Sequence, residues 1–298
     1  MSNEQKTAFI AIVGCPNVGK SSILNRLLGE KIAIVSPKPQ TTRTRIMGVL
    51  TDNETQLVFT DTPGYHKPKT KLGEAMVRAV GAGIRDVDAC LLVVEPYGEI
   101  RDAEKTLIKR IKEEEIPAVL AINKIDTVEN KEDLLARIMT FSQLCDFTAI
   151  VPVSAMDGNG LDELLDELKA LSFPGEHLFP DDTLTDQPEK VIAAEYIREK
   201  LLKYLDKEIP HGTAVAIERF KERENSDLLD IEATIYCEKE SHKGIIIGRG
   251  GEMLKKISTS ARRDLERFFH CRVNLQCWVK VKEDWRNREG LIHNFGLD

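Results

Sequence analysis

Short, wholly apolar runs alternate with amphipathic stretches through the first half of the chain. The runs "TAFIAIVG", "TQLVFTD", "DACLLVVE", "PAVLAINK" and "AIVPVSA" are typical of strands buried in a parallel sheet. The stretches between them, such as "AEKTLIKRIKEEE", have the period of helices. This alternation predicts an α/β domain in which helices cover both faces of a mostly parallel sheet. A ligand site is then expected at the carboxyl ends of the strands.

The pattern changes after residue 172. Residues 173–188, "FPGEHLFPDDTLTDQP", contain three prolines and no helical period, so we interpret them as a linker between two domains. Beyond them the pattern predicts a helix, two hairpin-like strands, a glycine loop, a helix, a strand and a final helix. This order is typical of an α+β domain with its helices on one face. The expected domains are residues 1–172 and 189–298.

Composition narrows the class of protein. With 298 residues, 42% of them hydrophobic, the chain suits two globular domains. No run reaches the roughly 18 apolar residues of a membrane span, and six cysteines without a CxxC pair are typical of reduced thiols in a cytoplasm. The net charge of −7 argues against a protein that coats nucleic acid indiscriminately, yet residues 241–282 hold ten basic and three acidic side chains.

The first glycine loop has the form of a phosphate-binding loop. "GCPNVGKS" fits GxxxxGKS/T between a strand and a helix, the context in which backbone N–H groups cradle phosphate oxygens. Lys20 is expected to reach the β- and γ-phosphates, and the Ser21 hydroxyl to bind Mg²⁺. The residues expected to contact phosphate are Gly14, Cys15, Pro16, Asn17, Val18, Gly19, Lys20, Ser21, Ser22 and, further along, Gly64.

A second motif selects the base. "NKID" follows the strand "PAVLAI", and a carboxylate at Asp126 can accept hydrogen bonds from two neighbouring N–H groups of guanine. Adenine has no such pair of donors, so Asp126 predicts a preference for GTP over ATP. The later "VSA" can supply a backbone N–H to the guanine oxygen. The residues expected around the base are Asn123, Lys124, Asp126, Ser154 and Ala155.

Two further segments are expected to respond to the γ-phosphate. "DTPG" follows a strand and places Asp61 near the magnesium ion and the Gly64 N–H near the γ-phosphate. In "PQTTRTR", Thr42 is the candidate that closes on Mg²⁺, and Thr41 is the alternative. The order and spacing of the four motifs are those of a GTPase, which forms GDP. The residues expected to switch are Thr41, Thr42, Asp61, Thr62, Pro63 and Tyr65.

A second glycine loop, "GIIIGRGGEMLKKI", does not resemble a nucleotide site, because it has no GKS/T ending and no acid placed for Mg²⁺. Its GXXG enters an amphipathic helix within the basic segment, as in a KH module, which clamps about four nucleotides of a single strand. Trp278 and Trp285 either stack on bases or anchor the end of the chain. The residues expected to contact RNA are Lys243, Gly248, Arg249, Gly250, Gly251 and Lys255.

Together, "GCPNVGKSS", "QTTRTR", "DTPGYHKPKTKLGEAM", "NKID", "REKLLKYL" and "IIIGRGG" resemble the bacterial Era family along nearly the whole chain. The resemblance implies a P-loop GTPase domain, a type II KH domain, slow Mg²⁺-dependent GTP hydrolysis, and binding to the 3′ end of 16S rRNA in the 30S subunit or its precursor. It also implies a role in rRNA processing and, for the family in general, peripheral membrane association. We expect a cytoplasmic monomer. Gly250 stands where relatives often have a polar or basic residue, so the affinity of the loop alone is expected to be modest.

The device that orients the attacking water is left open. Tyr65 stands where Ras-like enzymes have a glutamine. One hypothesis makes the adjacent His66 a base. Another, drawn from related GTPases, lets Asn17 hold a K⁺ ion that offsets charge on the phosphates, with loop shaping as the alternative. Two rival functions stay open as well: an RNA-binding scaffold with an unhydrolysed nucleotide, and a GTPase that assists RNA modification.

Overall fold

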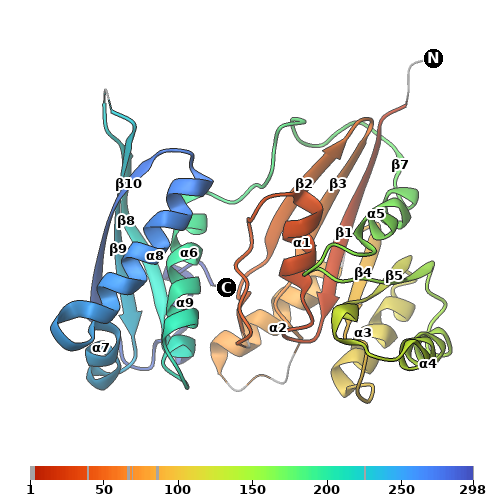
Figure 1. The fold of residues 1–298 in the computed structure, drawn as a ribbon, viewed down its shortest axis with the longest axis horizontal. Helices are drawn as coiled ribbons and strands as arrows, with labels where there is room; N and C mark the ends of the chain where they lie inside the picture. The colour runs from red at the N-terminus through yellow and green to blue at the C-terminus, as the bar shows by residue number, and fades with distance from the viewer. Residues whose placement is uncertain are drawn as a thin grey trace. The chain divides into compact units, whose positions relative to one another are not determined.

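The chain folds into two units (Figure 1). The structure, a computed structural model, describes residues 4–38, 40–65, 68, 70–84, 87–224 and 226–297, with the backbone alone at 82 and 84. By packing, the first unit comprises Met1–Ala33, Thr42–Pro68 and Ala75–Asp186, and the second comprises Ile34–Thr41, Lys69–Glu74 and Gln187–Asp298. Two short segments of the first half of the chain therefore pack with the second unit.

The first unit is built on a mostly parallel sheet. Its central strands are β1 (Lys6–Gly14), β2 (Ile46–Asp52), β3 (Thr55–Asp61), β4 (Ala89–Val94), β5 (Ala118–Ile122) and β6 (Ala149–Pro152). Their order is β2-β3-β1-β4-β5-β6, and β2 alone among these strands pairs antiparallel with its neighbour. Every residue of β4 and β5 is buried. Both faces of the sheet are therefore covered, which explains why these runs are continuously apolar rather than alternating.

Helices cover this sheet on both faces. They are α1 (Lys20–Leu28), α2 (Lys71–Ile84), α3 (Asp102–Glu113), α4 (Lys131–Ser142) and α5 (Leu161–Ala170). Leu107 of α3 and Phe141 of α4 share an apolar cluster with Ala11 of β1. Ile12, the next residue of β1, points to the other face and is also fully buried. The predicted α/β architecture is confirmed, although the sequence analysis passes over β2 and α2.

The segment interpreted as a linker is hydrogen-bonded to the first unit. β7 (Phe173–Pro174) pairs antiparallel with the start of β1. Further on, the buried Gln56 side chain accepts the N–H groups of Leu178 and Phe179 at 2.8 and 2.9 Å and donates to Phe179 O at 2.9 Å. Residues 173–186 thus pack with the first unit, and the boundaries drawn from the sequence stay a prediction.

His177 in this segment makes the stability of the first unit depend on pH. Its Nδ1 lies 2.7 Å from Asp181 Oδ1 and its Nε2 lies 3.1 Å from Glu54 O. Only a protonated ring can donate to both acceptors. The hydrogen bond to Asp181 accordingly raises the pKa of His177 above its usual 6.5. A histidine whose pKa is higher in the folded protein than in the unfolded chain stabilises the fold. This contribution is complete at pH values below the pKa in the unfolded chain, and it is lost as the pH rises through the pKa in the folded protein.

We expect the contribution of His177 to the free energy of unfolding to be complete below its usual pKa of 6.5 and to disappear as the pH rises through its raised folded pKa. His177→Gln should therefore flatten the pH dependence of stability, measured by urea denaturation at each pH. Asp181→Asn removes the charged acceptor and should flatten it as well. If both variants keep the wild-type slope, the ring is not held as the protonated form.

The second unit is built on a three-stranded sheet. Its elements are α6 (Glu189–Tyr204), β8 (Ala214–Glu222), β9 (Leu228–Cys237), α7 (Glu240–Ile247), α8 (Glu252–Phe268), β10 (Arg272–Val281) and α9 (Glu289–Asn294). Helices α6, α7 and α8 lie on one face of the sheet, and the C-terminal segment lies against the end of the other. β9 is central, antiparallel to β8 and parallel to β10. Ile197 of α6, Ile257 of α8 and Ile235 of β9 share one apolar cluster. The predicted α+β arrangement is confirmed.

The run "GIII" is helical, which the sequence analysis does not predict. It forms the second half of α7, where Ile246 is fully buried and Ile245 is 50% exposed. Three consecutive isoleucines favour a strand by propensity, and the packing of Ile246 among α6, α8 and β9 overrides this preference. The glycine loop therefore connects two helices, α7 and α8.

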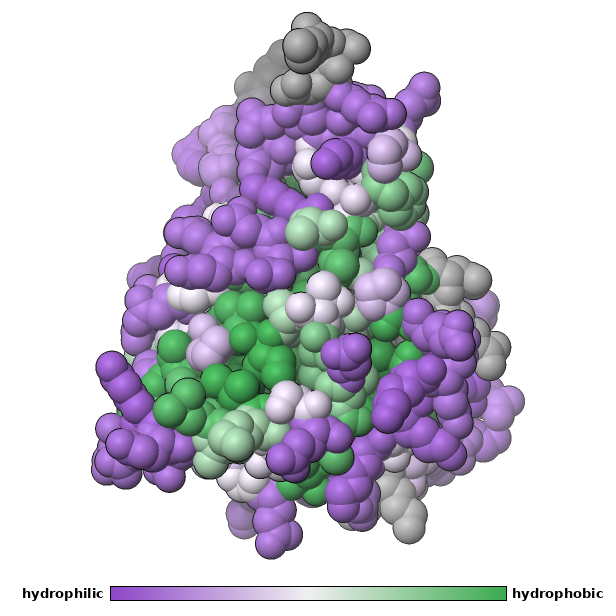
Figure 2. All heavy atoms as spheres, turned by 90° about the vertical axis from the view of Figure 1, so that its right-hand side faces the viewer, coloured by the Kyte–Doolittle hydropathy of each residue, from purple (hydrophilic) through white to green (hydrophobic). Residues whose placement is uncertain are grey.

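Apolar side chains also gather on the outer face of the first unit, where Figure 2 shows a green patch ringed by hydrophilic residues. On α4, Leu135 and Met139 are 60% and 63% exposed, whereas Phe141 is fully buried. α4 thus packs against the apolar cluster of the first unit through the side that carries Phe141, and Leu135 and Met139 stay exposed. None of the helices in the described part of the chain has the length and hydropathy required to cross a bilayer.

Candidate nucleotide and nucleic-acid sites

The loop between β1 and α1 adopts backbone conformations that few residues tolerate. Asn17 (φ 65°) and Gly19 (φ 100°) are both left-handed. A Cβ on Gly19 would stand 2.1 Å from Asn123 Nδ2, and one on Gly14 would stand 2.3 Å from Val93 O. The loop is therefore seated against the ends of β4 and β5. With the N-terminus of α1 directly after it, the loop has the backbone of a phosphate cradle.

Lys20 and Asp61 form a buried pair of opposite charge at this loop. Lys20 Nζ donates to Gly14 O at 3.2 Å and to Cys15 O at 3.1 Å. Burial lowers the pKa of Lys20 and raises the pKa of Asp61, while the attraction between the two opposes both shifts. A lysine held by loop carbonyls can exchange them for phosphate oxygens, which form stronger, charge-assisted hydrogen bonds.

Three oxygen-bearing side chains meet where Mg²⁺ is expected. Ser21 Oγ donates to Asp61 Oδ2 at 2.6 Å, and Thr42 Oγ1 lies 3.0 Å from Ser21 Oγ and 3.4 Å from Asp61 Oδ2. The second carboxylate oxygen, Asp61 Oδ1, is buried and accepts no hydrogen bond from the described residues. Burial of an unpaired carboxylate oxygen destabilises the fold unless a cation binds to it. A carboxylate and two hydroxyls are ligands that Mg²⁺ prefers, so these residues fit the ion.

The structure places the two threonines of "QTTRTR" differently. Thr42 is buried and joins Ser21 where Mg²⁺ is expected, whereas Thr41 Oγ1 donates to Lys38 O at 2.7 Å. Thr41 packs with the second unit, in which Arg198 of α6 donates to its carbonyl oxygen. Of the two candidates, Thr42 is therefore the one within reach of the magnesium site.

The "DTPG" segment lies directly against the phosphate loop. A Cβ on Gly64 would stand 2.6 Å from Pro16 Cα, so this approach requires glycine. The Tyr65 N–H donates to Gly14 O at 3.2 Å, and its ring packs against the apolar cluster under α3. His66 lies outside the described residues. Of the other expected residues, Cys15, Val18, Thr62 and Pro63 are buried, Ser22 is half-buried and Asn17 is exposed.

Asn123 ties the base-binding segments together. It is buried, its Nδ2 donates to Val18 O at 2.8 Å, and its Oδ1 accepts the Ala155 N–H at 3.0 Å. Asp126 Oδ1 accepts the Ser154 hydroxyl at 2.7 Å. Because Asp126 is otherwise exposed, its carboxylate is oriented and yet accessible to a base. Four of the residues expected around guanine are thus joined in two hydrogen-bonded pairs, Asn123 with Ala155 and Asp126 with Ser154.

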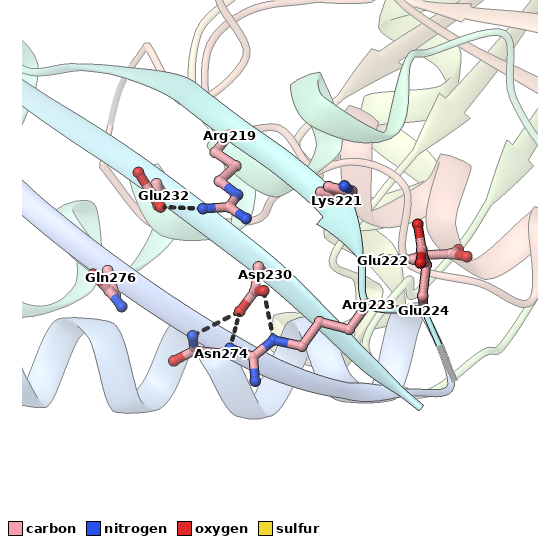
Figure 3. Close-up of a pocket in the computed structure, with 9 residues that line it drawn as sticks. All are labelled: Arg219, Lys221, Glu222, Arg223, Glu224, Asp230, Glu232, Asn274 and Gln276. Atoms are coloured by element: carbon pink, nitrogen blue, oxygen red, sulfur yellow. Dashed lines mark hydrogen bonds and ion pairs between the residues drawn. The ribbon is translucent and has the colours of Figure 1, made fainter. Parts of the chain in front are cut away.

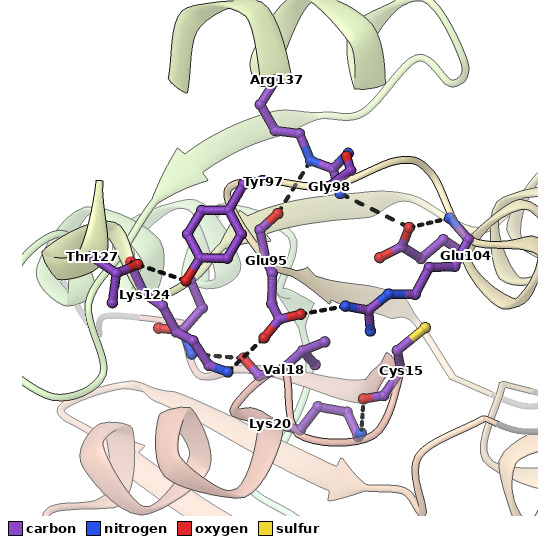
Figure 4. A network of polar contacts seen from close by, with 12 residues as sticks. Cys15, Val18, Lys20, Glu95, Tyr97, Gly98, Glu104, Lys124, Thr127 and Arg137 are labelled. Atoms are coloured by element: carbon purple, nitrogen blue, oxygen red, sulfur yellow. Dashed lines mark hydrogen bonds and ion pairs between the residues drawn. The ribbon is translucent and has the colours of Figure 1, made fainter. Parts of the chain in front are cut away.

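A polar network that the sequence analysis misses supports this pocket (Figure 4). Glu95, directly after β4, accepts Lys124 Nζ at 2.6 Å and the Arg101 guanidinium. Burial opposes ionisation of Glu95, but the hydrogen bonds from Lys124 and Arg101 prevail and lower its pKa. The Lys124 side chain is thereby held at the pocket. An acid at the carboxyl end of a buried strand, "LLVVE", is the signal that could have found it.

The second glycine loop is a tight turn with an open outer side. Gly248 (φ 75°) packs closely, because a Cβ there would stand 2.7 Å from Met253 Cβ. Gly250 (φ 62°) and Gly251 (φ 84°) are left-handed, and a Cβ on either would meet no described heavy atom within 4 Å. A sugar-phosphate backbone can therefore approach these two glycines. Arg249 and Lys255 are exposed and Lys243 is half-buried around the turn.

The two tryptophans lie in different environments. Trp285 is fully buried, its Nε1 donates to Gly212 O at 2.9 Å, and its ring contacts Phe295 with 5.4 Å between centroids. It therefore anchors the end of the chain, one of the two roles considered for it. Trp278 on β10 is 45% exposed.

Comparison with known proteins identifies a GTPase domain and a KH domain in this chain. Residues 9–124 match the family described as 50S ribosome-binding GTPase, and residues 208–286 match the KH domain. The chain thus combines a P-loop GTPase with a KH domain.

Individual relatives match nearly the whole chain. GTPase Era of Clostridioides difficile is 49% identical over 293 residues, which are 98% of this chain and 99% of the relative. GTPase Era of Ruminiclostridium cellulolyticum is 50% identical over 291 residues, 98% and 97% of the two chains. The chain belongs to the Era GTPase family, and it is an enzyme that hydrolyses GTP.

Two solved structures of Era align with this chain at a TM-score of 0.94. One is an Aquifex aeolicus Era variant bound to GDP and AlF₄⁻, at 38% identity. The other is Era in complex with MgGDPNP and nucleotides 1506–1542 of 16S ribosomal RNA, at 39% identity. Each alignment covers 98% of this chain and 99% of the other.

Proposed function

We propose that this chain is a GTP-dependent switch that binds the 3′ end of 16S rRNA and assists rRNA processing and assembly of the 30S subunit. The observation that carries the proposal is the presence, on one chain, of a guanine nucleotide site and of an open GXXG turn between two helices. The solved Era complex with 16S nucleotides supports the choice of RNA. We further propose that the protein is a cytoplasmic monomer that can associate peripherally with a membrane.

The RNA preference can be tested by fluorescence anisotropy with a labelled single strand that matches the 3′ end of 16S rRNA. The control is a scrambled strand of the same composition, because phosphate contacts alone do not distinguish sequences. The matching strand should bind more tightly at every salt concentration. Equal affinities with equal salt dependence would contradict a specific clamp and leave only electrostatic binding.

We propose that the nucleotide acts on the KH unit through the chain around Thr42. Thr42 meets Ser21 at the magnesium site, while Thr41 is bound by Arg198. The Val35 N–H, on the same stretch, donates to Glu199 of α6 at 3.2 Å. Because Thr41 and Thr42 share a peptide bond, closure of Thr42 on the site would pull on residues that α6 holds. Such a segment with two arrangements is a common switching device.

In the proposed hydrolysis, a bound Mg²⁺ would neutralise negative charge on the phosphates. Ser21, Thr42 and Asp61 would hold it, and Lys20 would bind the phosphate oxygens. Tyr65 packs against the core and offers no amide to orient water, which supports slow intrinsic turnover. Membership of a GTPase family speaks against the rival scaffold with an unhydrolysed nucleotide.

We propose that Asn17, exposed on the phosphate loop, helps to hold a K⁺ ion through its amide oxygen. Offsetting one charge at the phosphates should make GTP turnover about tenfold faster in KCl than in NaCl, equivalent to ~1.4 kcal/mol of barrier. Asn17→Gly removes the amide and keeps the left-handed backbone, so it should abolish the difference. The rate of GTP turnover is measured as phosphate release. Equal wild-type rates in KCl and NaCl would mean that Asn17 only shapes the phosphate loop.

A further inference from the structure

One face of the sheet in the second unit is not covered by α6 and α8, and β10 lines it with polar side chains. Alternate residues of β10, such as Val273, Leu275 and Val279, pack into the apolar clusters beneath the helices. Their neighbours therefore point to the opposite face. These outward residues are Arg272, Asn274, Gln276, Trp278 and Lys280, called the β10 stripe below.

Trp278 is the aromatic member of the β10 stripe. It is 45% exposed and lies opposite Thr234 of β9. Further along this face, the Tyr236 ring contacts Phe295 at 5.0 Å, so the C-terminal segment covers that end of the sheet. The cover reaches Tyr236 and leaves Trp278 accessible. Thr234 beside it is buried, but the indole on the edge strand stays exposed, and an exposed indole is a platform on which a base can stack.

A hollow of about 490 Å³ lies on the same face of the sheet. Figure 3 shows Arg219, Glu232, Asp230, Asn274 and Gln276 around it, from all three strands. Gln276 stands two residues before Trp278 on the same side of β10. The hollow therefore extends along β10 as far as Gln276, and Trp278 is the next outward-pointing residue of that strand.

Five of the nine side chains that line the hollow are joined by hydrogen bonds. Asp230 accepts Arg223 at 2.7 and 2.9 Å and Asn274 Nδ2 at 2.7 Å. Arg223 holds the pKa of Asp230 to about 2, so this carboxylate stays ionised. Arg219 lies 3.3 Å from Glu232. Asp230 and Glu232 are thus paired with arginines, Glu222 and Glu224 also line the hollow, and the amide of Asn274 is oriented. Oriented amides and carboxylates can donate to and accept from the edge of a base.

We propose that the β10 stripe is a second RNA-contact surface, on which a base of the strand leaving the GXXG turn stacks on Trp278. Arg272 and Lys280, exposed at the two ends of the stripe, would meet the phosphates on either side. Single-stranded RNA is the occupant that this pattern fits, because cations flank an aromatic ring and an oriented amide. The inference rests on the proposed function, since it extends the path of the RNA held by the GXXG turn.

The topology brings the two RNA contacts together. β10 is an edge strand of its sheet, and both α7 and α8 contact it. The GXXG turn and the β10 stripe therefore lie on the two sides of one edge strand. An RNA strand that passes around this edge reaches both, whereas a strand of about four nucleotides fills the GXXG turn alone.

The full-length protein offers a direct optical test, because Trp278 and Trp285 are its two tryptophans and Trp285 is fully buried. The probes are two single strands from the 3′ end of 16S rRNA. A strand of about four nucleotides is long enough to fill the GXXG turn, and a strand of about twelve nucleotides is long enough to reach the β10 stripe as well. The longer strand should quench tryptophan emission, and Trp278→Phe should abolish the quenching. Trp278→Ala should weaken binding of the longer strand about tenfold, as expected for one stacked base, and leave the shorter strand unaffected.

Several outcomes would overturn the inference. Unchanged affinity of Trp278→Ala for the longer strand would show that the indole makes no contact. Emission that changes with protein concentration in the absence of RNA would mean that the stripe is an interface between copies of the chain. Loss of wild-type binding to both strands would contradict the proposed function itself. Normal binding of both strands without quenching would overturn the stripe alone.

Discussion

Replacing Asp126 by asparagine should convert a GTP-specific enzyme into one that prefers xanthosine triphosphate. The Asp126 carboxylate accepts from guanine N–H groups, and an asparagine would present an N–H to them instead. A polar pocket that leaves such groups unpaired lowers affinity by on the order of 10⁴-fold. The 2-oxo group of xanthine would accept this N–H. The asparagine can still accept the Ser154 hydroxyl, so the local fold should survive.

The measurement is competition of GTP and xanthosine triphosphate against a fluorescent nucleotide. Asp166→Asn, an exposed position on α5 with the same chemical change, is the matched control and should keep the wild-type preference. Unchanged GTP affinity in Asp126→Asn would mean that the base lies elsewhere.

The second large effect is expected at the GXXG turn. Changing Arg249 and Gly250 together to aspartate should reduce affinity for the 16S 3′ strand at least about a hundredfold, because two negative charges would face phosphates. The fold should tolerate both changes. Arg249 is exposed, the position of a Cβ on Gly250 is open, and aspartate is among the residues that adopt the left-handed backbone found there.

RNA affinity is measured by anisotropy and GTP hydrolysis by phosphate release in the same preparation. Gly29 is also left-handed with open space around its Cβ position, and Lys105 is exposed. The matched control is the double variant Lys105→Asp and Gly29→Asp. It makes the same change of charge in the first unit, away from the GXXG turn, and should keep the wild-type affinity for RNA. If the GXXG variant also loses GTP hydrolysis, the cause is misfolding, and if it keeps RNA affinity, the clamp lies elsewhere.

Motifs that act through backbone geometry could be located from the sequence. Glycines at a fixed spacing, such as Gly14 and Gly19, mark positions where a Cβ would collide with Val93 or Asn123. The strands around them could also be predicted, because wholly apolar runs between helical stretches are typical of a parallel sheet that is covered on both faces. The fold class and the place of the nucleotide loop therefore followed from local patterns.

Features that depend on distant partners could not be found in this way. Glu95 holds Lys124, a residue 29 positions away, through the meeting of two neighbouring strand ends. The helical state of "GIII" depends on the burial of Ile246. Likewise, Thr41 and Thr42 are indistinguishable in the sequence, and only their opposite packing separates them. In each case tertiary contacts decide between local alternatives of similar energy.

The central claim is that GTP controls how the KH unit holds RNA. The most direct test is the affinity of the 16S 3′ strand for the full-length protein with GDP, with a nonhydrolysable GTP analogue and without nucleotide, across a salt series. We expect tighter binding with the analogue than with GDP at every salt concentration, by about fivefold or more, a typical coupling between two sites. Equal affinities in the three states would contradict the claim, because two functional sites without coupling do not make a switch.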